Sequence, residues 1–168
     1  MATAATPTAQ LRSFLAKYSP EIASRAQAIL KKMRARYPTA LELVYDNYNA
    51  LGIGFSPTER PSEVIFSIVL YPKWVSLFFL QAKGLPDPKK ILQGSGKQVA
   101  HIRLTSPDTL DDPAVVALMR AATARAKVPF DPQGKHRLVI RSISVQQRPR
   151  RPAATASPAR TRKTAKPY

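Results

Sequence analysis

The stretch VIFSIVLYPKWVSLFFLQA, Val64–Ala82, decides how the rest of the chain is arranged. It contains one charged residue and is long and apolar enough to resemble a membrane-spanning helix. However, Pro72 and Lys73 stand at its midpoint, where such a helix would place a proline and a cation at the centre of the bilayer. Both halves are rich in β-branched and aromatic residues, and proline favours the first central position of a turn. The stretch therefore predicts a β-hairpin, and we expect no membrane partner.

The two predicted strands of this hairpin, Val64–Tyr71 and Trp74–Gln81, are mostly apolar on both faces. Strands of this kind occupy central positions in a sheet that is covered on both sides. If helices pack on one face only, the other face must be covered by loops and the N-terminal segment, or by a second subunit. The pattern therefore leaves a monomer and a homodimer open.

Helical segments flank the hairpin in the sequence. Ser19 and Pro20 form a typical helix start, and the apolar spacing that follows predicts a helix from Glu21 to Tyr37. A second main helix is predicted from Asp112 to about Lys127. The remaining elements are a short helix at Leu11–Lys17, a helical turn in Leu85–Leu92, and strands at Leu41–Asp46, Ala50–Phe55, Val99–Leu104 and Leu138–Val145. This order predicts an α+β fold in which two main helices pack on a largely antiparallel sheet of five to six strands.

The chain is strongly basic, since 27 Lys and Arg against 10 Asp and Glu give 168 residues a formal net charge of +17. Beyond Val145 the composition shifts to proline, alanine and cations, so burial cannot offset the entropy of ordering this segment. We therefore expect a frayed N-terminus at 1–10, one α+β domain at 11–145 and a disordered tail at 146–168. The tail cations are candidates for nonspecific binding of nucleic acid: Arg148, Arg150, Arg151, Arg160, Arg162, Lys163 and Lys166.

Several kinds of chemistry are excluded or disfavoured by what the sequence lacks. There is no cysteine, which excludes disulfides, thiolate metal sites and cysteine nucleophiles, and is compatible with a bacterial cytoplasmic protein. The two histidines, His101 and His136, have no acidic partner at metal-ligand spacing, and no GxSxG nucleophile motif is present. We expect no cofactor and no metal site.

The motif GSGK at Gly94–Lys97 is similar to a phosphate-binding loop but departs from GxxxxGK[ST]. Its first glycine is too close to the lysine, Gln98 stands in place of Ser or Thr, and a predicted strand follows. Two interpretations remain. Either this is a glycine turn that leads into the strand, or Gly94, Ser95, Gly96 and Lys97 form an anion-binding turn.

A second candidate site surrounds Asp46, which lies between Tyr45 and Tyr48. Asp46 is either a strand-end residue or the polar anchor of a ligand pocket. Tyr71 and Trp74 flank the hairpin turn and belong either to the core or to a rim at the end of the sheet. The candidate pocket comprises Tyr45, Asp46, Tyr48, Tyr71, Trp74 and Lys97. The aromatic residues lack the spacing of an RNA-recognition motif, so the sequence does not indicate a base-stacking sheet.

The run from Tyr45 to Lys97, with the motifs YDNYNAL, LFFL, LPDP and GSGK, resembles the YdhG-like family, a bacterial domain of unknown function. The resemblance spans roughly residues 20–127. It implies a small α+β fold often compared with frataxin, with two helices on an antiparallel sheet, and no established catalytic activity. Some relatives are described as frataxin-like iron chaperones, a role that needs an acidic surface, whereas Glu21 is the only acid of the first long predicted helix here.

We therefore expect a non-enzymatic module that binds a small ligand or a protein partner, with a basic tail that attracts nucleic acid. Two alternatives stay open. One is a frataxin-like iron chaperone, and the other is an enzyme with a pocket around Tyr45, Asp46 and Lys97.

Overall fold

The computed structural model describes residues 4–94 and 97–152. In this part of the chain three α-helices and a six-stranded sheet follow one another in the order ααβββββαβ, which confirms the predicted α+β class. The helices are α1 (Pro7–Leu15), α2 (Pro20–Arg36) and α3 (Pro113–Ala124). The strands are β1 (Leu41–Asp46), β2 (Leu51–Ser56), β3 (Phe66–Leu70), β4 (Val75–Phe79), β5 (Ala100–Leu104) and β6 (Arg137–Ile143). Two 3-10 helices, η1 (Pro61–Glu63) and η2 (Pro107–Asp111), precede β3 and α3.

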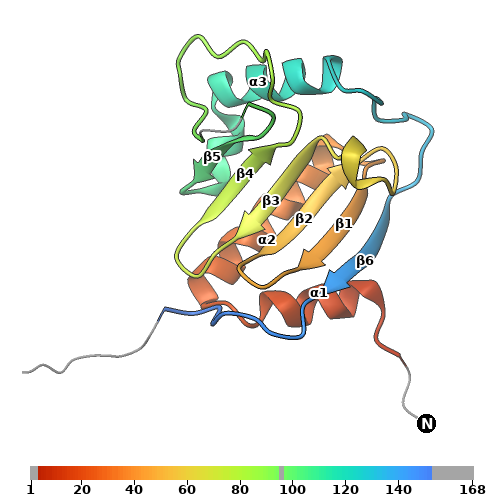
Figure 1. Cartoon of the computed structure of the whole chain (residues 1–168), viewed down its shortest axis with the longest axis vertical. Coiled ribbons are helices and arrows are strands. Elements are labelled where there is room, and N and C mark those ends of the chain that lie inside the picture. The colour runs from red at the N-terminus through yellow and green to blue at the C-terminus, as the bar shows by residue number, and fades with distance from the viewer. Residues whose placement is uncertain (1–3, 95–96, 153–168) are drawn as a thin grey trace, which may run out of the picture.

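The sheet has the strand order β5-β4-β3-β2-β1-β6 (Figure 1). Neighbours from β1 to β5 are antiparallel, and β6 returns to lie parallel to β1 at the edge. The predicted hairpin is confirmed as β3 and β4, in the register Phe66↔Phe79 to Leu70↔Val75. Both strands have neighbours on each side, as their apolar composition indicates. Among the helices of the described residues, none combines the length and apolarity needed to cross a bilayer.

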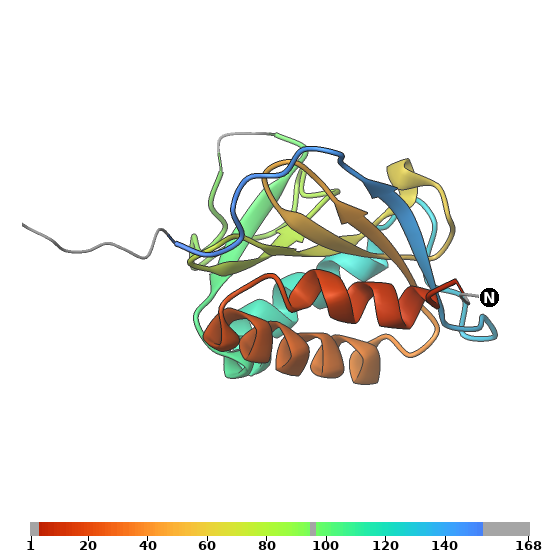
Figure 2. The same ribbon diagram turned by 90° about the horizontal axis from the view of Figure 1, so that it is seen from below.

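All three helices pack on one face of the sheet, as Figure 2 shows from below. Strand alternation directs every second side chain of β1 to β5 into this layer, including Val44, Ile53 and Ile68. The predicted main helices correspond to α2 and α3, and α1 adds a third apolar face to the same core. On the opposite face, the described residues place only loops and the single turn of η1.

The helix starts follow the predicted capping residues. The Ser19 hydroxyl accepts the Ile22 N–H at α2, and the Asp112 carboxylate accepts the Ala114 N–H at α3. At α1 the prediction of a frayed terminus up to residue 10 is wrong, because the helix begins at Pro7. Thr6 supplies a hydroxyl cap there, which the prediction overlooked.

Two further predictions need correction. The stretch Leu85–Leu92 contains a single hydrogen-bonded turn, Lys90 N–H to the Asp87 carbonyl, in place of the predicted helical turn. The Asp87 carboxylate caps this turn by accepting the N–H groups of Ile91 and Leu92. The predicted domain boundary after Val145 comes too early, since residues 147–151 bind the end of the sheet through hydrogen bonds described below. The remainder of the predicted disordered tail, 153–168, lies outside the described residues.

Candidate functional site

The face of the sheet opposite the helices has small residues at its centre. Gly54 of β2 pairs with Ser67 of β3, and Gly52 lies diagonally across from Ser67 on the same face. A methyl group at Gly52 would meet only the Ser67 Oγ, at 3.6 Å, within 4 Å. Farther along β2, Val64 lies close over Gly54, and Leu43 of β1 is fully buried. The loop after η1 therefore covers one half of this face, and the half that contains Gly52 stays open.

Two adjoining hollows occupy the open half. The first, with a volume of about 380 Å³, lies over Gly52 and Ser67, and the second, of about 600 Å³, extends past Trp74. They share Asn49 and Tyr71, and we refer to them together as the trough. The trough is lined by Tyr45, Asn47, Tyr48, Asn49, Ala50, Gly52, Ser67, Val69, Tyr71, Pro72, Trp74, Arg148, Pro149 and Arg151. None of these residues is acidic.

Aromatic rings form much of the trough. Tyr71 and Trp74 stack with their ring centroids 4.8 Å apart, and the Arg103 guanidinium lies 4.5 Å from the Trp74 centroid. Tyr48 is 51% exposed. The Tyr45 hydroxyl is buried, and no group in the described residues hydrogen-bonds to it. The trough thus offers planar aromatic surface beside guanidinium groups.

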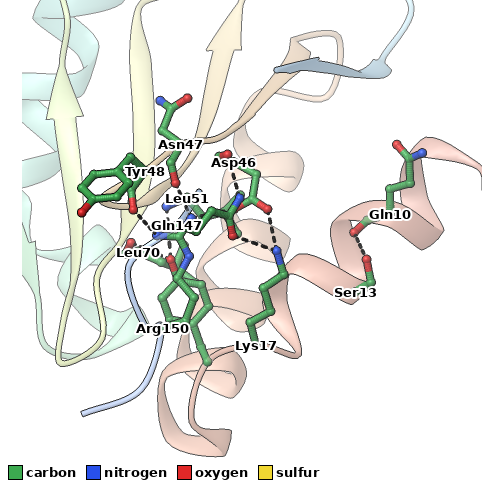
Figure 3. A network of polar contacts seen from close by, with 11 residues as sticks. Gln10, Ser13, Lys17, Asp46, Asn47, Tyr48, Leu51, Leu70, Gln147 and Arg150 are labelled. Atoms are coloured by element: carbon green, nitrogen blue, oxygen red, sulfur yellow. Dashed lines mark hydrogen bonds and ion pairs between the residues drawn. The ribbon is translucent and has the colours of Figure 1, made fainter. Parts of the chain in front are cut away.

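One wall of the trough is formed by the segment Gln147–Arg151, which we call the strap. Its anchor is Arg150, whose side chain is 3% exposed and donates to Asp46 Oδ1 at 2.9 Å (Figure 3). Lys17, from the loop after α1, donates to Asp46 Oδ2 at 2.9 Å, and the Asp46 side chain is 1% exposed. Burial alone would raise the pKa of the Asp46 carboxyl, but hydrogen bonds from Lys17 and Arg150 outweigh it and hold that pKa below its ordinary value.

Further hydrogen bonds fix the strap to the β1–β2 turn and to α1. Arg150 donates to the carbonyls of Asn47 and Tyr48. The Arg148 N–H donates to the Tyr48 carbonyl at 2.9 Å. At the end of α1, Arg151 donates to the carbonyls of Ala16 and Lys17, which have no partner within the helix. The strap therefore holds Arg148, Pro149 and Arg151 at the edge of the trough.

No carboxylate lines the trough, because the acidic side chains of this protein have partners in other parts of the fold. All ten acidic side chains lie in the described residues, and each forms an ion pair, caps a helix or closes a turn elsewhere. By contrast, Arg103, Arg148, Arg151 and the adjacent Lys73 form no ion pair with any described carboxylate. The open end of the sheet therefore has an uncompensated positive charge.

The structure brings together only part of the predicted pocket. Tyr45, Tyr48, Tyr71 and Trp74 all line the trough, as the pocket hypothesis requires. Asp46 does not, because strand alternation points it to the helix side, where it pairs with Lys17 and Arg150. Lys97 does not either. Lys97 precedes β5, the edge strand on the side of the sheet away from β1 and β6. It lies at the strand ends that are far from the β3–β4 turn.

The other predicted site residues have mixed outcomes. Gly94 has a φ of 115°, which suits a glycine turn, and Gln93 beside it bridges to His101. Ser95 and Gly96 lie outside the described residues, so the anion-binding turn stays a prediction. Among the tail cations, Arg150 is not free for a polyanion, because its charge is buried against Asp46. Arg160, Arg162, Lys163 and Lys166 lie outside the described residues.

A second buried carboxylate, Glu42, also holds elements of the fold together. Glu42 is fully buried, accepts two hydrogen bonds from Arg34 at 2.7 and 2.8 Å, and contacts His136 Nε2. This group connects α2, β1 and the segment before β6. Within residues 4–94 and 97–152, no group of three or more histidine and carboxylate side chains is placed to hold a metal ion.

Comparison with known proteins adds no relative. No protein-family model, no curated protein and no solved structure matches this chain. The resemblance to the YdhG-like family therefore stays a prediction, and the function has to be argued from the trough itself.

Proposed function

We propose that this protein is a non-enzymatic nucleic-acid-binding module, and that the trough on the open face of the sheet is its binding surface. The observation that supports this most strongly is the separation of charge. Every carboxylate is engaged elsewhere, while Arg103, Arg148 and Arg151 surround an acid-free trough beside Trp74 and Tyr71. Guanidinium groups bind phosphate, and aromatic rings stack on bases.

The two alternative functions have less support. An iron chaperone needs clustered carboxylate oxygens, and no three carboxylate or histidine side chains in the described part of the chain are placed to hold a metal ion together. The alternative enzyme pocket required Asp46 and Lys97 beside Tyr45. However, the Asp46 side chain points to the opposite face of the sheet from Tyr45, and Lys97 lies at the other end of the strands.

Salt dependence of binding tests the proposal. If Lys73, Arg103, Arg148 and Arg151 each neutralise one phosphate of a single strand, these four contacts contribute a slope of about −3 in log K against log salt, at roughly −0.7 per contact. We expect the triple variant Arg103→Gln/Arg148→Gln/Arg151→Gln to reduce the slope by about 2. The titration uses the full chain with a fluorescent 12-mer.

A matched control removes the same charge from the helical side. Arg12, Lys31 and Arg120 are exposed and form no ion pair among the described residues. Changing these three to glutamine should leave the slope close to that of the unaltered protein. If both triple variants lose affinity equally, binding follows total charge and not the trough, and the proposal is refuted.

A further inference from the structure

We infer that the hollow over Gly52 is a base-binding slot, which accepts an unstacked nucleobase of single-stranded nucleic acid. This inference rests on the proposed function and narrows it from phosphate attraction to recognition of the base. The slot is the 380 Å³ half of the trough, with a floor of Gly52 and Ser67 and walls of Tyr45, Tyr48 and Tyr71.

The floor of the slot is shaped by the absence of a side chain. Apart from the Ser67 Oγ at 3.6 Å, no atom lies within 4 Å of where a Gly52 Cβ would stand. Any other residue would therefore project a side chain into the hollow. Glycine in a strand interior weakens the strand and often marks a close approach by a ligand. Gly52 is not required by its backbone, because its φ lies outside the positive range.

The walls present flat apolar surface and polar groups in the combination that a base needs. Tyr48 is 51% exposed, so one ring is accessible for stacking. Asn47 and Asn49, in the β1–β2 turn, line the same hollow and supply amide groups. The Tyr45 ring lines the same hollow and adds a second aromatic wall.

The surroundings favour a single strand over other occupants. Arg148 and Arg151 border the adjoining hollow, where the phosphates on either side of an inserted base would lie. A base inside a duplex is stacked on both faces and cannot enter a slot of this kind without being extruded. An acidic peptide would meet the same arginines, but its Asp and Glu side chains have no aromatic face to stack on Tyr48.

The experiment compares dT12 with an abasic 12-mer of the same backbone charge and with a dT12·dA12 duplex, using the full chain at one salt concentration. We expect dT12 to bind at least tenfold more tightly than the abasic strand, since one stacked base contributes about this factor. Gly52→Val should reduce this preference to about twofold or less, while binding of the abasic strand is unchanged. Gly52→Ala should give an intermediate value.

A second variant keeps the test independent of folding. Tyr48→Ala removes an exposed ring whose hydroxyl forms no hydrogen bond among the described residues, and it should also reduce the preference for dT12. If the unaltered protein binds dT12, the abasic strand and the duplex equally, or if both variants retain the full preference, the slot is refuted while the proposed function stands. If none of the three ligands binds, the proposed function itself is refuted.

Discussion

Arg150 anchors the strap, so replacing it should lower the stability of the protein. Replacing it with Met keeps most of the apolar stem but removes the guanidinium that pairs with Asp46 at 2.9 Å. Asp46 would then keep only Lys17, which is 41% exposed, as its charged partner. Because that partner remains, we expect the free energy of unfolding to fall by about 2 kcal/mol, less than the ~3–5 kcal/mol for a carboxylate left fully uncompensated.

Urea unfolding monitored by Trp74 fluorescence and circular dichroism measures this change, and a neighbouring arginine provides the control. Arg148 is exposed and forms no ion pair among the described residues, so Arg148→Met should change stability by less than about 0.5 kcal/mol. A double-mutant cycle with Asp46→Asn should give a coupling energy of about 1–2 kcal/mol. If Arg150→Met matches Arg148→Met in stability, the buried pair does not hold the strap, and the reasoning fails.

Two further predictions concern buried hydrogen bonds. Tyr18→Phe should cost about 2 kcal/mol in urea unfolding, because the Tyr18 hydroxyl donates to the Leu70 carbonyl and accepts from the Leu51 N–H inside the core. Tyr48→Phe should change nothing, and an equal loss in both variants would contradict the assignment. The lowered pKa of Asp46 predicts that its contribution is fully present above pH ~4 and is lost as pH falls through the pKa of the folded state. Urea midpoints at pH 7, 4 and 3 should therefore decline less steeply in Asp46→Asn, and an identical decline would contradict the prediction.

The helices, strands and their order follow from local patterns in the sequence. The proline and lysine inside Val64–Ala82 indicated a turn, and the capping residues Ser19 and Asp112 marked helix starts. The return of β6 beside β1 could not be predicted in the same way, because it depends on pairing between residues about 100 positions apart.

The strap shows why composition alone misplaced the end of the domain. Arg150 lies in a segment of prolines and cations, and no large apolar residue nearby in the sequence indicates that it is buried. Its burial depends on Asp46, 104 positions earlier, which needs a counter-charge at the helix side of the sheet. Alternation along β1 did contain a signal, since Asp46 shares the face of Val44 and not that of Tyr45.

The trough itself was only partly predictable. The aromatic residues on either side of the β3–β4 turn indicated a rim, and Tyr71 and Trp74 do form one. The floor formed by Gly52 and Ser67 depends on the register of two neighbouring strands, which sets these two small residues diagonally across from each other. Arg103 reaches Trp74 only because β5 is paired with β4.

Amide chemical-shift mapping on the full chain can locate the surface that binds nucleic acid. During titration with dT12, we expect the largest shifts at Gly52, Ser67 and the Trp74 indole N–H. Residues on the far side of α2 and α3, such as Lys31 and Arg120, should be unaffected. Shifts confined to the helical face, or to residues 153–168, would contradict the claim that the open sheet face binds nucleic acid.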